Sequence, residues 1–365
     1  DDPAWIAPLD LLERMRISPS GNPFFRPGEA ELFLARRGDE VVGRISAQID
    51  PRIEARRGRI VGQFGFFCCR DDPEAARALV DATAEWCRAR GAVALEGPFS
   101  FSINEECGLL VEGFTTPPAM LMNHARPWFG ALLEGAGLTK AMDTFAYRLS
   151  LAGADDRLSR LVALAEPAKG PDLHIRPIDV SRFEAEIRVV VDVFNDAWSD
   201  NWGFLSFSEA EIAALVRELR PFYRPGYGRI AELDGEPIAI MLAIPDLVGI
   251  TADFGGRLLP FHWVRLARTL WRDEARSFRI PLLGIRKRHR SNLIGARILP
   301  LLIADFLAEA ARRDIDWVEF SWVLESNRAM NALAQLVSGE PIKRYRIYEM
   351  SLTADVSEAL PTVRE

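Results

Sequence analysis

Basic side chains are concentrated in one short stretch of the chain, residues 283–296, with the sequence LGIRKRHRSNLIGA. Lys287, Arg288, His289 and Arg290 follow one another there, between apolar residues on both sides. The pattern predicts a buried strand, a basic loop and the start of a helix. A helix N-terminus offers backbone N–H groups without intrahelical partners and the positive end of the helix dipole, and both favour phosphate. The stretch therefore predicts a phosphate-binding loop, with a solvated basic turn between two core elements as the alternative.

The elements after this loop would hold it in place. A helix is predicted at about residues 298–313, a strand at 316–322, and a second helix between Asn327 and Gly339. Proline beyond the first helical turn removes a hydrogen bond and clashes with a preceding carbonyl. Pro300 therefore predicts that the first of these helices starts late or is kinked.

Composition limits the classes of protein that fit. A length of 365 residues suggests two domains or one large one, and 48% hydrophobic with 27% charged residues is ordinary for a soluble globular protein. The net charge of -7 argues against a general nucleic-acid binder. The four cysteines show no metal-ligand spacing, so reduced thiols and no metal site are expected. With no signal peptide and no apolar run near the ~20 residues that span a bilayer, we expect a cytoplasmic protein.

The first half of the chain predicts a small α/β arrangement. Two strands, at about 32–35 and 41–49, flank a polar turn, and residues 62–69 form a third, apolar strand. Asp72-Pro73-Glu74 is typical of a helix start, because proline suits the first helical position and acids suit the first turn. A strand at 93–95 and a closing strand at 144–149 complete this half.

A long segment with little periodicity, residues 97–126, interrupts that half. Loops of this length inside a compact domain are usually functional. Its polar candidates are Asn104, Asn123 and His124, with Glu105 and Glu106 beside them. The alternative is that the asparagines satisfy turn backbones and that His124 is a hydrogen-bonded structural residue.

The second half repeats the order of the first: hairpin, strand, helix, strand, helix, glycine, closing strand. Its hairpin is signalled by Asp234-Gly235 between two apolar runs. The elements recur about 200 residues apart, which indicates two copies of one domain and not a solenoid. The predicted fold class is α/β (α+β), with two domains that each hold a mixed, largely antiparallel sheet flanked by helices. The predicted division is residues 1–153, a linker at 154–171, and 172–365.

The two copies differ where phosphate would bind. In the first copy the turn at residues 70–74 is acidic and lacks glycine, so it would repel phosphate. The C-terminal copy is therefore predicted to bind a phosphate-containing cofactor. The N-terminal copy is predicted to form a wall of the site for the second substrate, the acceptor.

The second copy also carries an insertion at residues 247–278, with a helical stretch that contains Leu266, Leu270 and Trp271. If exposed, this stretch would face lipid or an acyl chain, and Arg265, Arg268 and Arg272 would suit anionic headgroups. If buried, it would be another core helix.

Several motifs together resemble a known family. GQFGFF, GPFSFSINEECGLLVEGF, GRLLPF, and SWVLESNRAMN followed by KRYRIYE resemble the duplicated (tandem) GNAT-like acyl-CoA N-acyltransferases, a family that includes the bacterial ceramide synthases. The resemblance extends from about residue 22 to residue 350. It implies transfer of a fatty acyl group from acyl-CoA to the amine of a sphingoid long-chain base, with no metal and with peripheral membrane contact left open.

The resemblance also implies site residues. The phosphate loop, the strand before it and an asparagine after the next strand would contact coenzyme A, and these residues are Ile285, Arg286, Lys287, Arg288, Arg290, Ser291, Asn292, Leu293, Ile294, Gly295, Ala296 and Asn327. A backbone N–H near Ile285 or Arg286 would stabilise the oxyanion.

Proton transfer needs a base for the amine and an acid for the leaving thiolate. Glu319 is the first candidate base and His289 the second, with Tyr345 as the acid. The family often places a tyrosine one helix earlier, where this chain has Ala334. The alternative for Glu319 is an ion pair with a neighbouring arginine.

On the acceptor side, the resemblance implies contacts from Asn104, Asn123, His124 and Trp202. Two other functions stay open: a tandem GNAT enzyme that acts on a polar amine or aminoacyl acceptor, and a non-catalytic CoA-binding protein.

Overall fold

The computed structural model describes residues 2–152, 159, 161–163, 172–221 and 223–353. The chain forms two compact units, each assembled from separate segments. The larger unit takes residues 1–23, 110–124 and 143–345, and the smaller unit takes 24–109, 125–142 and 346–365. The two units are thus not the two halves of the chain. Most of the predicted linker, 154–171, lies outside the described residues.

The smaller unit is a sheet with helices packed on it. Helix α3 packs against β1, β2 and β3, and it also contacts α4. Its start follows the predicted signals, because the Asp72 side chain accepts from the Ala75 N–H and Pro73 occupies the first turn. The elements are β1 (Glu29–Arg37), β2 (Glu40–Ile49), α2 (Pro51–Arg57), β3 (Val61–Cys69), α3 (Pro73–Arg88), β4 (Ala94–Gly97), the short pair β5 (Phe99–Ser100) and β6 (Glu106–Cys107), and α4 (Phe129–Gly135).

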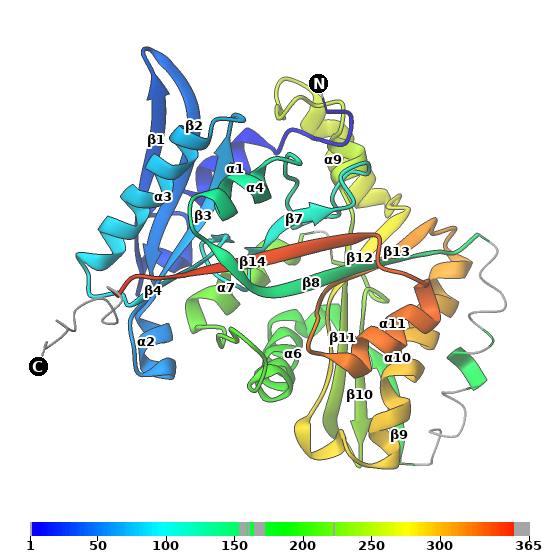
Figure 1. Ribbon diagram of the computed structural model, residues 1–365. Coiled ribbons are helices and arrows are strands. Elements are labelled where there is room, and N and C mark those ends of the chain that lie inside the picture. The colour runs from blue at the N-terminus through cyan, green and yellow to red at the C-terminus, as the bar shows by residue number, and fades with distance from the viewer. Residues whose placement is uncertain (1, 153–158, 160, 164–171, 222, 354–365) are drawn as a thin grey trace, which may run out of the picture. The chain divides into compact units, whose positions relative to one another are not determined.

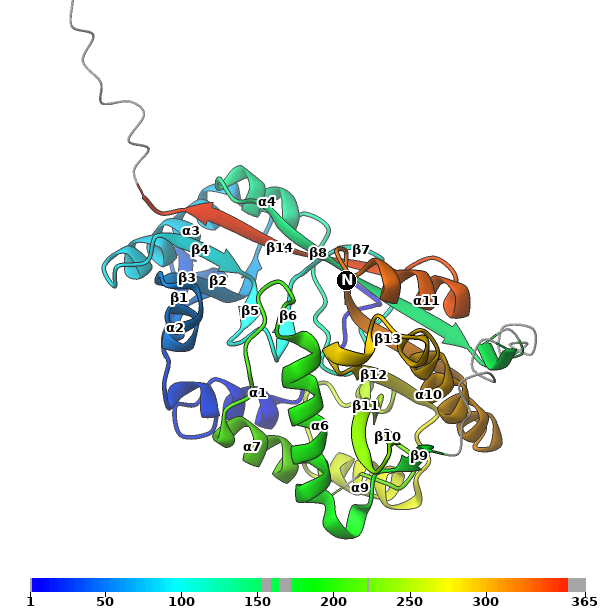
Figure 2. The same ribbon diagram turned by 90° about the horizontal axis from the view of Figure 1, so that it is seen from below.

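The larger unit has the same plan with more helices. In Figures 1 and 2, α6 lies on one face of its strands and α10 lies on the opposite face. Its strands run in the order β13-β12-β11-β10-β9. The elements are α1 (Asp10–Arg16), β9 (Leu173–Pro177), α6 (Phe183–Trp198), α7 (Glu209–Leu219), β10 (Gly228–Leu233), β11 (Glu236–Pro245), α8 (Val248–Thr251), α9 (His262–Arg272), β12 (Ser277–Ile285), α10 (Leu293–Arg312), β13 (Trp317–Leu324) and α11 (Arg328–Ser338). Strand β7 (Leu109–Glu112) runs from the smaller unit into this one.

The closing strands explain why the units differ from the halves of the chain. Strand β8 (Thr139–Ser150) ends the first copy, yet it pairs antiparallel with β13 of the second copy, from Trp317↔Ser150 to Leu324↔Thr144. Strand β14 (Lys343–Ser351) ends the second copy, yet it pairs antiparallel with β4 of the first copy. Each copy therefore completes the sheet of the other. The predicted repeat and fold class are confirmed, whereas this exchange of strands was not predicted.

Both copies carry a bulge in the equivalent strand. In β3 the register slips by one residue between Arg44↔Cys68 and Ser46↔Gly65, and in β12 it slips between Leu242↔Leu282 and Ile244↔Arg279. Such bulges bend a strand and increase its twist. In β3 the bulge follows the last parallel pair, Gln63↔Glu96, whereas in β12 it contains the last parallel pair, Ile280↔Phe320.

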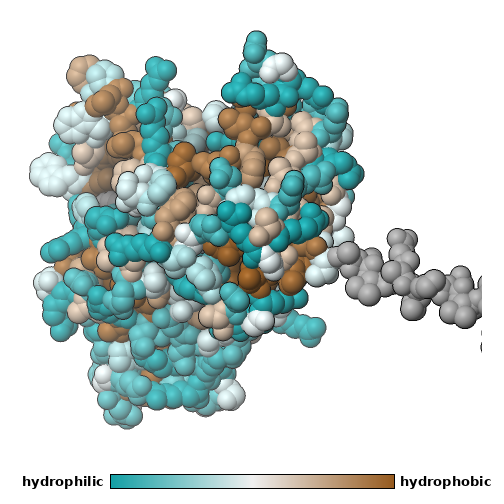
Figure 3. Space-filling model, turned by 90° about the vertical axis from the view of Figure 1, so that its left-hand side faces the viewer, coloured by the Kyte–Doolittle hydropathy of each residue, from teal (hydrophilic) through white to brown (hydrophobic). Residues whose placement is uncertain are grey.

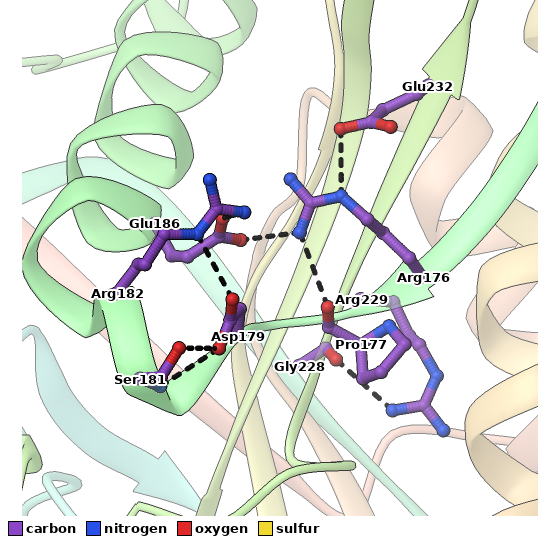
Figure 4. A network of polar contacts seen from close by, with 9 residues as sticks. All are labelled: Arg176, Pro177, Asp179, Ser181, Arg182, Glu186, Gly228, Arg229 and Glu232. Carbon is purple, nitrogen blue, oxygen red and sulfur yellow. Dashed lines mark hydrogen bonds and ion pairs between the residues drawn. The ribbon is translucent and has the colours of Figure 1, made fainter. Parts of the chain in front are cut away.

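Strand β9 at the sheet edge is fixed to α6 by the network in Figure 4. Arg176 donates to Glu232 on β10 at 2.8 Å and to Glu186 on α6 at 2.6 Å. Glu186 is buried, so this charge is compensated by an arginine that reaches it from the strand. The contact orients α6, whose other end carries the acids beside the basic loop.

The start of α10 corrects one prediction. The helix begins at Leu293, so residues 293–296 belong to its first turn and not to a loop. Pro300 lies inside the continuous helix, and the predicted late start is therefore wrong. No helix of the described residues is long and apolar enough to cross a bilayer.

Candidate active site

A gap between two parallel strands of the larger unit leads to the basic loop. Strands β12 and β13 pair only as far as Ile280↔Phe320, although β12 continues to Ile285. The Arg286 N–H donates to Ile238 O of β11 at 2.8 Å. Because successive N–H groups of a strand point to opposite sides, the Ile285 N–H points to the side on which β13 has separated. Of the two N–H groups predicted to stabilise the oxyanion, that of Ile285 therefore faces the gap, whereas that of Arg286 is bonded to β11.

The loop after β12 is packed tightly onto the start of α10. A Cβ atom at Gly295 would lie 1.9 Å from the His289 carbonyl oxygen, so only glycine permits this approach. The Gly295 N–H is already engaged as a donor, because it bonds to the Asn292 side-chain oxygen at 2.9 Å. The first turn of α10 contains no acidic residue. Its end therefore keeps the positive potential that suits phosphate.

Acidic groups of α6 and its C-terminal loop hold the basic side chains in place. The Lys287 ammonium pairs with Asp200 at 2.5 Å, and the Lys287 N–H donates to Asp196 at 2.8 Å. Arg286 pairs with Asp192. Arg290 donates to the Ala197 carbonyl. A bound pyrophosphate would have to exchange for some of these contacts.

Arg288 and His289 lie on the exposed side of the loop. Arg288 pairs with Glu236, and its Nε donates to His289 Nε2 at 3.0 Å. Partial burial and the charge of Arg288 lower the pKa of His289, which favours the neutral imidazole. Its Nε2 already accepts the hydrogen bond from Arg288, so His289 helps to hold the conformation of the loop.

Glu319 lies fully buried in mid-strand, level with Arg279 in the register of β12 and β13. One of its oxygens is 2.8 Å from Arg148 of β8, and the other accepts from the Ser321 hydroxyl at 2.8 Å. Arg279 in turn donates to the Ser321 hydroxyl at 2.9 Å. The ion pair that was the alternative for Glu319 is therefore present, and the carboxylate belongs to a buried polar cluster.

Asp246, directly after β11, belongs to the same cluster and was not predicted. One oxygen accepts from the Met120 N–H at 2.8 Å. Burial, and to a lesser degree the charge of Glu319, raise the pKa of Asp246 to about 6. The only hint in the sequence is an acid that follows an unbroken apolar strand, IAIMLAIPD.

Lys343, at the start of β14, is the second residue that sequence reasoning missed. Its ammonium donates to Gly113 O at 2.7 Å and to Thr116 O at 2.6 Å. Burial lowers the pKa of Lys343 to about 8, and the nearby Glu319 partly opposes the shift. Tyr345 is two residues further on, so the two side chains share a face of the strand, and both are fully buried.

Asn327 is the N-cap residue of α11. Its side chain accepts from the Met330 N–H at 3.2 Å and so caps α11. One turn later, Asn331 accepts from the Tyr147 hydroxyl at 2.8 Å. Burial raises the pKa of Tyr147, which keeps the phenol protonated. This tyrosine of β8 reaches the helix where the family would place its own, near Ala334.

The predicted acceptor residues fall in both units. His124 lies in the larger unit, where its Nε2 is 2.9 Å from Asp2 and its buried Nδ1 has no partner among the described residues. Asn123 and Trp202 belong to the same unit and are half-buried. Asn104 belongs to the smaller unit, where its N–H donates to Ser102 at 3.0 Å.

The equivalent gap of the smaller unit is filled by its own chain. Strands β3 and β4 pair from Val61↔Ala94 to Gln63↔Glu96, and the chain after β4 then remains against β3. A Cβ atom at Gly65 would lie 1.7 Å from the Phe99 carbonyl oxygen. The Gln48 amide, fully buried, donates to the carbonyls of Phe99 and Phe101 at 2.9 and 2.7 Å.

Two α/β copies that exchange closing strands, one of them with a splayed strand pair and a basic loop at a helix N-terminus, define a tandem GNAT fold. A solved tandem GNAT protein from the clavulanic acid biosynthesis pathway aligns with a TM-score of 0.55 over 95% of this chain and 88% of that chain, at 15% identity. Identity at that level supports the fold alone.

The sequence identifies the family. The chain is 40% identical over 359 residues to the bacterial ceramide synthase of Caulobacter vibrioides (strain NA1000 / CB15N), across 96% of this chain and 91% of that protein. It is 37% identical over 352 residues to protein YghO of Escherichia coli (strain K12), across 96% and 90% of the two chains. No family model matches. The protein belongs to the duplicated GNAT-like acyl-CoA N-acyltransferase family that these relatives represent.

Proposed function

We propose that the protein transfers a fatty acyl group from acyl-CoA to the amine of a sphingoid long-chain base. The observation that carries the proposal is the 40% identity to a bacterial ceramide synthase over 96% of the chain. No large part of the molecule lacks a counterpart in that relative. The buried polar cluster beside the β12–β13 gap supports the same class of reaction.

The basic loop after β12 binds the nucleotide end of acyl-CoA. Arg288, Arg290 and the first turn of α10 hold the pyrophosphate, and Gly295 allows the loop to close against the helix. Arg279, level with Glu319, precedes Ile285 by six residues, or about 20 Å of extended strand. The pantetheine arm follows this part of β12, where Pro281, Leu282 and Leu283 are half-buried and not fully covered.

Acyl-CoA would supply an activated carbonyl carbon and a thiolate leaving group. The Ile285 N–H donates to the carbonyl oxygen, where negative charge develops. An amine with a pKa near ~10 arrives protonated, and its proton passes to Glu319 through a chain of waters before attack, because Glu319 is level with Arg279 and so lies about 20 Å along β12 from Ile285. The C–N bond forms and the C–S bond breaks. Tyr345 donates a proton to the thiolate and takes up the second proton that the nitrogen loses as it becomes an amide, while Glu319 releases the first proton to solvent. The products are an amide and free coenzyme A.

The test is acyl transfer by the purified protein, with sphinganine as acceptor and either acetyl-CoA or palmitoyl-CoA as donor, read by mass spectrometry. An N-acylated base from the long-chain donor is the expected result. Coenzyme A binding without product from either donor would overturn the lipid acceptor and direct the search to polar amines.

A second measurement addresses the role of Glu319. Glu319→Gln keeps the shape of the side chain and removes its basicity. If Glu319 is the base, kcat falls by about 100-fold, while KM for acyl-CoA hardly changes. A fall in thermal stability with an unchanged kcat of the folded protein would assign Glu319 to structure alone.

A further inference from the structure

The insertion of the larger unit exposes large apolar side chains. Helix α9 contains no buried residue, so the buried-helix alternative from the sequence is wrong for it. The exposed fractions of Trp271, Phe261, Leu259 and Trp263 are 78%, 75%, 74% and 51%. Leaving four such side chains in water within thirteen residues costs free energy that a partner surface would recover.

These side chains are ordered around the helix. Trp263, Ala267 and Trp271 are four residues apart and exposed, so they form one stripe. Arg265, Arg268 and Arg272 form a second exposed stripe beside it. The half-buried pair Leu266 and Leu270 faces the protein.

The charge of the segment has one sign. Residues 257–272 contain four arginines and no aspartate or glutamate. Arg265 pairs with Asp253 at 2.6 Å and Arg272 with Glu274 at 3.7 Å, both outside the segment. Arg257 and Arg268 form no ion pair with any described residue. Aromatic rings beside arginines match the boundary between acyl chains and anionic headgroups.

The N-terminal segment extends the apolar surface. The Asp10 N–H donates to Gly256 O at 2.8 Å, which ties the start of α1 to the base of the insertion. Helix α1 has no buried residue, and it exposes Leu11, Leu12 and Met15. Two short helices without buried residues are thus joined at one point of the larger unit.

Exposed apolar residues alone do not mark a docking surface. On the face drawn in Figure 3, small hydrophobic patches alternate with hydrophilic side chains, as on ordinary soluble proteins. Leu34 of β1, for example, is exposed, but Arg37 near it is neutralised by ion pairs with Asp72 and Glu74. The insertion differs because aromatic and cationic stripes run along the same helix.

We infer that residues 257–272, together with α1, dock the larger unit onto an anionic lipid bilayer. Helix α9 lies in the headgroup region, with Trp263 and Trp271 inserted and Arg268 and Arg272 at the phosphates. This goes beyond the proposed reaction, since it requires no particular amine acceptor. Docking would bring any membrane-borne acceptor to the unit that holds the basic loop.

The experiment is co-sedimentation with vesicles of phosphatidylethanolamine and phosphatidylglycerol, compared with vesicles of phosphatidylcholine. The protein should bind the anionic vesicles, and binding should weaken as salt rises. Arg268→Gln with Arg272→Gln should lower the affinity about fivefold for each arginine, and Trp263→Ser with Trp271→Ser about tenfold for each tryptophan. The matched controls Arg312→Gln and Leu34→Ser, exposed elsewhere, should bind like the unchanged protein.

Thermal melts verify that the variants fold, and the exposure of every changed side chain makes folding failure unexpected. Equal binding to both vesicle types, or equal loss in the controls, would overturn the inference. So would absence of vesicle binding with self-association that the tryptophan variants abolish, because the surface would then contact a second copy. Vesicle binding needs no turnover, so it can fail or succeed independently of the acyl-transfer assay.

Discussion

The two copies of the domain treat the same gap between parallel strands in opposite ways. In the smaller unit the chain after β4 stays against β3, with Phe99 O at Gly65 and the Gln48 amide on the carbonyls of Phe99 and Phe101. In the larger unit the one glycine of β12, Gly284, lies against the Trp198 ring of α6. Backbone therefore fills the gap of the smaller unit, whereas in the larger unit β13 leaves β12 after Ile280↔Phe320.

The helices that follow the two gaps, α3 and α10, also differ in the charge at their N-termini. The first turn of α3 carries Pro73, which has no N–H, and Asp72 and Glu74, which pair with Arg37. The first turn of α10 contains no acidic residue, so no ion pair of this kind forms within it. A duplicated fold can thus keep its architecture in both copies while the charge at the start of the equivalent helices differs, because that charge depends on a few residues at one helix end.

The largest effect on coenzyme A affinity is expected from a substitution in the basic loop after β12. Gly295→Val places a side chain 1.9 Å from the His289 carbonyl, so the loop must move by more than an ångström. We expect coenzyme A affinity, measured by titration calorimetry, to fall roughly 100-fold. Gly249→Ala, where a Cβ would meet nothing within 4 Å, is the control. Unchanged affinity in Gly295→Val would remove the loop from the cofactor site.

The filled gap should respond in stability and not in binding. Gly65→Ala forces a Cβ against a backbone carbonyl, and the expected cost is about 3 kcal/mol of unfolding free energy in urea. Coenzyme A affinity of the folded protein should not change. Gly135→Ala, with open space around it, should cost little. A loss of coenzyme A affinity in Gly65→Ala would show that both gaps contribute to the site.

Each copy also places an aspartate directly after its second hairpin strand, and only one is paired with a cation. Asp50 accepts hydrogen bonds from the guanidinium and from the backbone N–H of Arg52, whereas Asp246 accepts from the Met120 N–H. The pKa of Asp246 is raised from 3.8 to about 6, so the folded protein keeps this proton after the unfolded chain has released it. The unfolding free energy should therefore fall as pH rises from about 4 to 6, by at most about 3 kcal/mol.

Asp246→Asn should flatten that part of the stability–pH curve, since the amide does not titrate and can still accept from Met120. Urea unfolding at several pH values is the measurement. An unchanged slope in Asp246→Asn would mean that other groups determine the pH dependence.

The smallest effect compares two exposed arginines at equivalent turns. Arg288→Gln removes a charge beside the α10 end and should weaken coenzyme A about tenfold at low salt, with less effect at high salt. Arg70→Gln changes the equivalent turn before α3, where Arg70 pairs with Glu40, and should have no effect on binding. Equal losses in both variants would contradict the assignment of the cofactor to one copy.

The sequence by itself determined the elements, the repeat and the difference between the two turns. Local signals suffice for these: Asp72-Pro73 starts α3, Asp234-Gly235 turns the hairpin, and the basic run precedes α10.

Only the tertiary structure decided which strands complete which sheet and which side chains meet. Strands β8 and β14 pair with the opposite copy, and no local pattern encodes the partner of a strand. The contacts of Glu319 with Arg148 and of Lys343 with Gly113 join residues 171 and 230 positions apart. Burial of Asp246 and exposure of α9 have the same origin, because the free energy of a charge or an aromatic ring depends on what the rest of the chain places around it.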